Sequence, residues 1–98
     1  MKLSEEQVSS RLQTLQGWLL ADETTIRKTY LFREFYTGIR FVNEVARIAQ
    51  ELNHHPVIHI EYTKVTLSLS THEVNGLSDL DFRSAAHYDA SFGILLHE

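Results

Sequence analysis

Four of the six histidines, His54, His55, His59 and His72, fall within one nineteen-residue stretch of the chain. Imidazole titrates near neutral pH, so a group of histidines can take and give protons during a reaction. His54 and His55 are adjacent and precede a proline, and Asp81 supplies a carboxylate further along. If three of these rings converge, the chemistry they favour is proton transfer, with His54, His55 and His72 as the acid and base groups.

The elements around these histidines predict that they do converge. Residues 57 to 71 alternate between apolar and polar side chains and hold two strands, with Thr63-Lys64 as the turn. In a tight hairpin the start of one strand lies beside the end of the other, which brings His54-His55 and His72 to the same edge of the sheet. His72 ends the polar row of the second strand, so the alternation points it away from the apolar face.

Structural explanations of the same residues remain open. Asn53-His54-His55-Pro56 is also a reasonable helix stop in which imidazoles cap carbonyls, and Asp81 completes a capping box with Ser78. His59 fits a solvent-facing strand residue. A zinc site is the competing functional interpretation. It is disfavoured because adjacent residues in an extended segment point in opposite directions, and because the chain has neither His-x-x-x-His spacing nor cysteine.

The rest of the chain supplies the elements that hold these residues in place. Ser4 with Gln7 forms a capping box, and the apolar spacing that follows predicts a helix running to a stop at Gly17. The other expected elements are strands at 18–20 and 25–33, a helix from about 36 to 52, and a last helix from 78 to 96. The sequence thus predicts one α+β domain over residues 1–98. It has a four-stranded, mainly antiparallel sheet with three helices on one face, in the order αββαββα.

Composition limits the partners. The chain has 98 residues, no cysteine and a formal net charge of −4, and its basic residues are scattered. Nucleic acid is therefore not expected as a direct partner. No apolar run reaches the roughly 18 residues of a membrane span, and the first ten residues lack a hydrophobic signal core. We expect a cytoplasmic protein that does not bind membranes, and a chain this short is often reinforced by oligomerisation.

A longer pattern joins these segments without insertion: Glu51-Leu52-Asn53-His54-His55-Pro56, Tyr62-Thr63-Lys64-Val65, Leu69-Ser70-Thr71-His72-Glu73, Gly76-Leu77-Ser78 and Asp81. Together with Gly17-Trp18 and Tyr30-Leu31-Phe32 upstream, it resembles the pterin-4a-carbinolamine dehydratase family over nearly the whole chain. Two positions depart from the family pattern. Gln50 stands where an acidic residue is frequent, and Ile58 stands where an aromatic residue is usual.

The resemblance implies an enzyme that dehydrates 4a-hydroxytetrahydropterin to quinonoid dihydropterin, with no metal or organic cofactor. The substrate would come from an aromatic amino-acid hydroxylase that uses tetrahydrobiopterin or a related pterin. The resemblance implies proton transfer by His54 and His72 and pterin orientation by His55. Supporting or substrate-binding roles fall to Asp81, Trp18, Glu51 and Thr71.

The resemblance also implies a homodimer or homotetramer, and it leaves a second class of function open. Members of the family act as binding proteins, one as a dimerisation cofactor of a transcription activator and others in RuBisCO assembly. Such a role does not require three histidines, so their joint presence favours catalysis.

Overall fold

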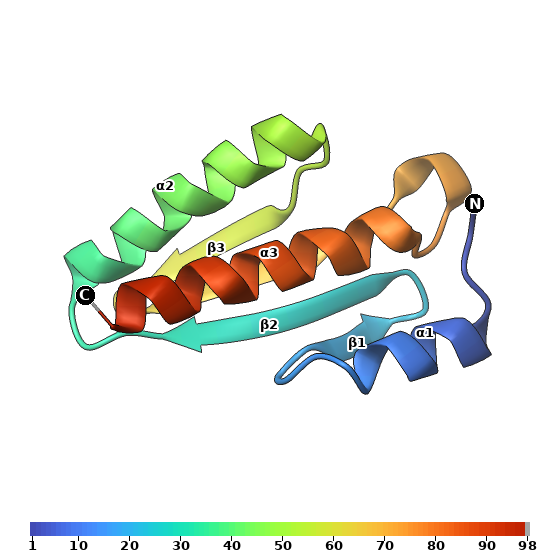
Figure 1. The fold of residues 1–98 in the computed structure, drawn as a ribbon, viewed down its shortest axis with the longest axis horizontal. Coiled ribbons are helices and arrows are strands. Elements are labelled where there is room, and N and C mark those ends of the chain that lie inside the picture. The colour runs from blue at the N-terminus through green and yellow to red at the C-terminus, as the bar shows by residue number, and fades with distance from the viewer. Residues whose placement is uncertain (98) are drawn as a thin grey trace.

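The computed structural model describes residues 1–97 and places two long helices across one face of a four-stranded sheet (Figure 1). Its elements are α1 (Glu5–Leu12), β1 (Leu19–Asp22), β2 (Thr25–Leu31), α2 (Phe35–Leu52), β3 (Val57–Glu61), β4 (Lys64–Leu69), the short 3-10 helix η1 (His72–Val74) and α3 (Asp79–Leu96). The α+β class and the order αββαββα are confirmed, with η1 as an added turn of helix between β4 and α3.

The sheet has the strand order β1-β2-β4-β3, and every neighbouring pair is antiparallel. Alternation along the two central strands buries one face, formed by Ile26, Tyr30, Val65, Leu67 and Leu69. The helices cover this apolar face, so the core lies between them and the sheet.

The helices pack through the apolar stripes that their sequences present. Helix α2 buries Phe41, Val45 and Ile48, and α3 packs beside it with Phe82, Tyr88 and Leu95 turned inward. Helix α1 adds Val8 to the same core.

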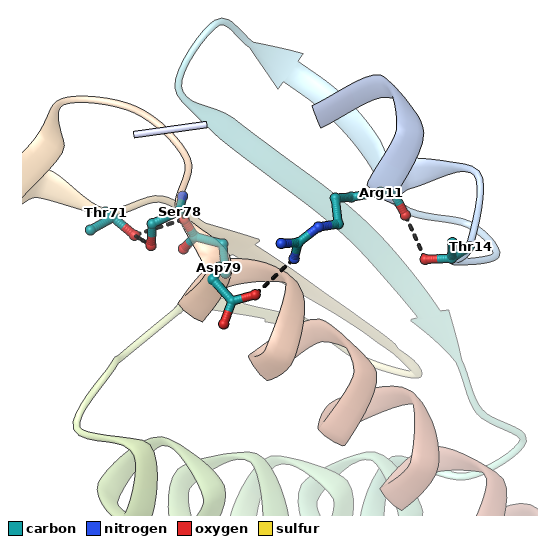
Figure 2. Close-up of polar contacts among 6 residues, drawn as sticks. Arg11, Thr14, Thr71, Ser78 and Asp79 are labelled. Atoms are coloured by element: carbon teal, nitrogen blue, oxygen red, sulfur yellow. Dashed lines mark hydrogen bonds and ion pairs between the residues drawn. The ribbon is translucent and has the colours of Figure 1, made fainter. Parts of the chain in front are cut away.

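A polar contact ties α1 to the start of α3. Arg11 in α1 forms an ion pair of 2.8 Å with Asp79, and Thr14 donates a 2.7 Å hydrogen bond to the carbonyl of Arg11 (Figure 2). The backbone N–H of Leu3 donates to the carbonyl of Leu77 at 2.8 Å. These contacts hold the N-terminal segment against the β4–α3 connection, which carries part of the candidate site.

The expected length of the first helix is wrong. The capping box at Ser4 is confirmed, but α1 ends at Leu12 and not at Gly17. Leu15 makes an i−3 hydrogen bond to Leu12, so the chain tightens into turns. Gly17, at φ +82, then lets the chain reverse into β1, so its left-handed conformation serves the reversal and not the helix end.

The expected turn between the last two strands is wrong by one residue. Glu61 pairs with Lys64, so the two-residue turn consists of Tyr62 and Thr63. Tyr62 takes the left-handed conformation at φ +50, the backbone twist that a tight hairpin needs. No glycine or asparagine marks the position, and alternation alone did not locate it. The hairpin itself, and the placement of its open end, are confirmed, because Val57 at the start of β3 pairs with Ser68 near the end of β4.

Candidate active site

The turn at the end of α2 directs the side chains of the two adjacent histidines to different partners. Asn53 adopts a left-handed conformation at φ 50, and its N–H bonds back to the carbonyl of Gln50 at 3.3 Å. The N–H of His54 reaches the carbonyl of Ala49 at 3.1 Å, which completes a Schellman cap. Asparagine tolerates this conformation better than most residues, so the sequence ends the helix here. Beyond the cap, the side chains of His54 and His55 have different partners.

His54 is paired with Asp81 at the first turn of α3. Its Nε2 lies 2.6 Å from Oδ1 of Asp81; the His54 side chain is 10% exposed and the Asp81 side chain 0% exposed. The two residues are 27 positions apart in the sequence. Asp81 thus keeps the capping role predicted for it, and it also holds an imidazole from the other side of the site.

The other oxygen of Asp81 is held by the β4–α3 connection. Its Oδ2 accepts a 2.7 Å hydrogen bond from the Thr71 hydroxyl and a 3.0 Å hydrogen bond from the backbone N–H of Ser78. The hydroxyls of Thr71 and Ser78 are 2.8 Å apart (Figure 2). Because Thr71 donates to Asp81, the Ser78 hydroxyl donates to Thr71. Every bond in this buried chain is directed towards the carboxylate.

This network fixes which nitrogen of His54 carries the proton. An ionised carboxylate only accepts hydrogen bonds, so His54 must donate to it through Nε2–H. When the ring is neutral, Nδ1 is then the atom that can accept a proton. His54 is therefore held in a fixed orientation by its contact with Asp81.

His72 lies next in the chain to Thr71, at the first residue of η1, and its side chain is exposed. Strand alternation predicted that it points away from the apolar face, and its exposure agrees with this, but β4 ends at Leu69, so alternation is not the reason. Thr71 forms only an isolated bridge with Gly76 before the chain turns into η1. His72 thus follows Thr71 of the network directly in the chain, and the turn into η1 sets its direction.

His55 and Glu51 lie on the outer side of the end of α2. The Nε2 atom of His55 is 2.6 Å from Oε1 of Gln50, and both residues are exposed. Glu51 forms a 2.7 Å ion pair with Arg47, which lies one helical turn earlier. Neither residue takes part in the hydrogen-bond network around Asp81.

Trp18 belongs to a different polar cluster. It is 3% exposed, and its indole N–H lies 3.2 Å from both carboxylate oxygens of Asp89 in α3. Lys28 and the Tyr30 hydroxyl contact the same carboxylate at 2.9 and 2.5 Å. Burial, and then the hydrogen bond to Asp89, raises the pKa of Tyr30 above its ordinary value. Trp18 fastens β1 and β2 to α3 and lies in the core, not at the surface where a ligand could stack.

A surface hollow of about 460 Å³ adjoins the network. Its wall includes His54, Asn53 and Thr71, together with Leu3 and Gln7 from the N-terminal segment. The other predicted site residues do not line it: His55, His72, Asp81, Glu51 and Trp18. A larger hollow of about 640 Å³ lies between α2 and α3 and contains Glu51 but none of the three histidines of the predicted site. Of these two hollows, chemistry favours the smaller one, because His54 lies on its wall.

Three contributors to the site were not predicted as such. Gln50 was noted only as a departure from the family pattern, and Ser78 only as a helix cap. Leu3 helps to form the wall of the hollow, although its residue type gave no signal of this. The spacing of Ser78 and Asp81 was the one sequence signal that could have connected the cap to the site.

Within residues 1–97, no three side chains of histidine, cysteine, aspartate or glutamate lie close enough together to hold a metal ion. Over the same residues, no helix combines the length and apolar character needed to cross a membrane.

The chain is similar to known proteins along most of its length. The profile of the family described as "Pterin 4 alpha carbinolamine dehydratase" matches residues 1–91. A relative from Paracidovorax citrulli, provisionally named a pterin-4-alpha-carbinolamine dehydratase, is 42% identical over 91 residues, which cover 90% of this chain and 78% of that protein.

Two solved structures share the fold. One is a transcriptional coactivator/pterin dehydratase from Brucella melitensis, with a TM-score of 0.91, 31% identity, and coverage of 95% of this chain and all of that chain. The other is a pterin dehydratase-like RuBisCO assembly factor of the alpha-carboxysome, with a TM-score of 0.69, 21% identity, and coverage of 80% and 92%. At that identity the second likeness shows the fold alone. By the match over residues 1–91 and these relatives, the chain belongs to the pterin 4 alpha carbinolamine dehydratase family.

Proposed function

We propose that this protein dehydrates 4a-hydroxytetrahydropterin to quinonoid dihydropterin. The observation that carries the proposal is that His54, on the wall of a hollow, is paired with the buried carboxylate of Asp81. A carboxylate buried behind an imidazole orients the ring and supports its charged form, which proton transfer requires. Membership of the family supplies the class of substrate.

The reaction needs two proton movements and no change of oxidation state. The bond between C4a and the hydroxyl oxygen breaks, and a general acid protonates the departing hydroxide so that water leaves. N5 loses its proton to a general base, and the electron pair left on N5 forms the C4a–N5 double bond. A proton passed between the acid and the base afterwards restores both groups.

The structure favours His54 as one of these groups because its Nε2 is occupied and its Nδ1 can accept or return a proton. His72 is the second group in the proposal, since it directly follows Thr71, which contacts Asp81. Acid or base assistance contributes about 10²- to 10⁴-fold, or roughly 3–5 kcal/mol of barrier for each group.

The remaining predicted residues keep more distant roles in the proposal. His55 orients the pterin from the outer side of the cap, and Thr71 positions His54 through Asp81. Glu51 adds negative charge at the end of α2. Trp18 acts only through the packing of β1 and β2 against α3, because its indole is buried there.

The test is to mix purified protein with freshly generated 4a-hydroxytetrahydropterin and follow the quinonoid product by absorbance. We expect acceleration over the spontaneous reaction that a chelator does not change. His54→Ala and His72→Ala should each lower turnover about 100-fold or more. His59→Ala is the matched control, because His59 is an exposed residue of β3 outside the site. Turnover within threefold of the original protein in both site variants would overturn the assignment.

A non-catalytic binding role is the second candidate function. The printed descriptions of the two structural relatives include a transcriptional coactivator and a RuBisCO assembly factor. Such a role needs exposed surface and gives no reason to bury an imidazole on a carboxylate. A protein that fails to accelerate the reaction while keeping its fold would favour this second candidate.

We extend the proposal to a homodimer or homotetramer that works beside an aromatic amino-acid hydroxylase. The sheet supports the first part, because β1 and β3 are edge strands with one unpaired side each. Light scattering of the purified protein tests the number of subunits.

A further inference from the structure

The two adjacent histidines use the same ring nitrogen for different partners. Nε2 of His54 lies 2.6 Å from the carboxylate of Asp81, and Nε2 of His55 lies 2.6 Å from the side-chain oxygen of Gln50. The first partner is a buried anion, whereas the second is a neutral amide at the surface. Both rings are therefore held in place, but only His54 has a charge behind it that compensates an added proton.

We infer that Gln50 is the positioning residue of His55, which it holds as the Nε2–H form with Nδ1 presented as a hydrogen-bond acceptor to the substrate. The amide oxygen has no proton to give, so the bond requires that the imidazole donate. Among residues 1–97, no hydrogen bond reaches Nδ1 of His55. That atom is left to receive an N–H or O–H group from a ligand.

The cap at Asn53 makes this contact possible. Gln50 and His55 are five positions apart, and in a continuous helix they would not face one another. The left-handed residue folds the chain back so that the ring of His55 meets the last turn of α2. The contact therefore depends on the same turn that directs His54 to Asp81.

This inference rests on the proposed function and refines it. An amide-backed ring is suited to binding, and a carboxylate-backed ring is suited to proton transfer. The ligand group that meets His55 must be a hydrogen-bond donor, such as a ring N–H, an exocyclic amino group or a hydroxyl of the pterin. A substrate analogue that offers only acceptors there should bind more weakly.

The test exchanges the chemistry of residue 50. Gln50→Glu keeps an acceptor, whereas Gln50→Lys offers only donors and forces Nε2 of His55 to accept. Both variants should fold, because the position is exposed. In Gln50→Lys the added cation also lies in the last helical turn, where the helix dipole favours it. Gln13→Lys is the matched control, since it adds the same charge at an exposed position at the end of α1.

Two measurements read the result. Nitrogen-15 NMR of the imidazoles, about two pH units above the range in which an ordinary histidine titrates, shows which nitrogen carries the proton. We expect Nε2–H at His55 in the original protein and in Gln50→Glu, and Nδ1–H in Gln50→Lys. Kinetics with 4a-hydroxytetrahydropterin should show KM raised about three- to tenfold in Gln50→Lys, with kcat much less affected, because one hydrogen bond is lost.

The outcomes separate this inference from the function it refines. An original protein with Nδ1–H at His55, or a Gln50→Lys variant that keeps Nε2–H, overturns the role of Gln50 even if the enzyme is active. A proton that moves as expected while KM stays unchanged overturns the role in binding. Absence of dehydratase activity in the original protein defeats the proposed function, while the NMR result still decides the contact.

Discussion

Asp81→Asn is the substitution that tests the site most directly, because it keeps the shape of the side chain and removes its charge. In the original protein one carboxylate oxygen accepts from His54, and the other accepts from Thr71 and from the backbone N–H of Ser78. The new side chain has one acceptor and one donor group. The N–H of Ser78 cannot reverse, so the asparagine oxygen should stay with Ser78 and Thr71. Its NH₂ group then faces His54.

This orientation reverses the proton position on His54. An NH₂ group donates, so Nε2 of His54 must accept and the proton of the neutral ring moves to Nδ1. The nitrogen that should take a proton in the reaction then already carries one. We expect kcat to fall at least about 100-fold, the lower end of what a general acid or base contributes.

The same substitution should cost stability. Hydrogen bonds to a charged group contribute about 1.5–3 kcal/mol, and those between neutral groups about 0.5–1.5 kcal/mol. Since the fully buried carboxylate accepts three bonds, the free energy of unfolding should fall by about 3 kcal/mol. Urea unfolding measures this loss, and the absorbance assay measures kcat under conditions in which the variant is folded.

Asp22→Asn is the matched control, because Asp22 is the exposed last residue of β1 and lies outside the site. It removes the same charge and should leave kcat unchanged. The reasoning about His54 is refuted if Asp81→Asn keeps turnover within threefold of the original protein, or if nitrogen-15 NMR still finds the proton on Nε2.

Two further predictions concern groups outside the network, the buried Tyr88 and the partly buried Asp89. Burial, with a contribution from the charge of Asp81, raises the pKa of Tyr88 from 10.0 to about 12, so the folded state holds this proton more tightly than the unfolded chain. The contribution of this proton to the free energy of unfolding is fully present below about pH 10 and is lost as the pH rises towards 12. The free energy of unfolding of Tyr88→Phe should therefore rise relative to that of the original protein by up to about 2–3 kcal/mol across that range. A stability difference between the two that stays constant from pH 9 to about 12 would contradict this. Asp89→Ala leaves the indole of Trp18 and the ammonium of Lys28 without their carboxylate, and it should lower the free energy of unfolding by about 3 kcal/mol. Urea unfolding followed by tryptophan fluorescence measures this loss, and a change below about 1 kcal/mol would show that the cluster is not needed.

Local chemistry allowed several elements to be predicted. Ser4 with Gln7 and Ser78 with Asp81 begin helices through contacts three residues apart, and these starts are confirmed. Asn53 before a proline ends α2 through its own backbone conformation. The predictions that failed were also local, because the end of α1 and the turn at Tyr62-Thr63 lack a specific residue signal.

The site shows where prediction from spacing reached its limit. The hairpin of β3 and β4 was enough to predict that His54 and His72 belong to the same end of the sheet. It could not show that the chain turns into η1 before His72, since alternation holds only while the strand lasts. Nor could it show that Trp18 is buried on Asp89, because that contact spans 71 positions.

The amino-acid sequence by itself determined the fold class, the helix starts and caps, and the residues able to move protons, because each depends on neighbours within a few positions. Only the tertiary structure decided that Asp81 meets His54 through one oxygen and Thr71 and Ser78 through the other. It also decided that Gln50 meets His55 across the cap. The physical reason is that a hydrogen bond assigns a proton to one nitrogen only when its partner is in place, and packing brings Asp81 to His54 from another part of the chain.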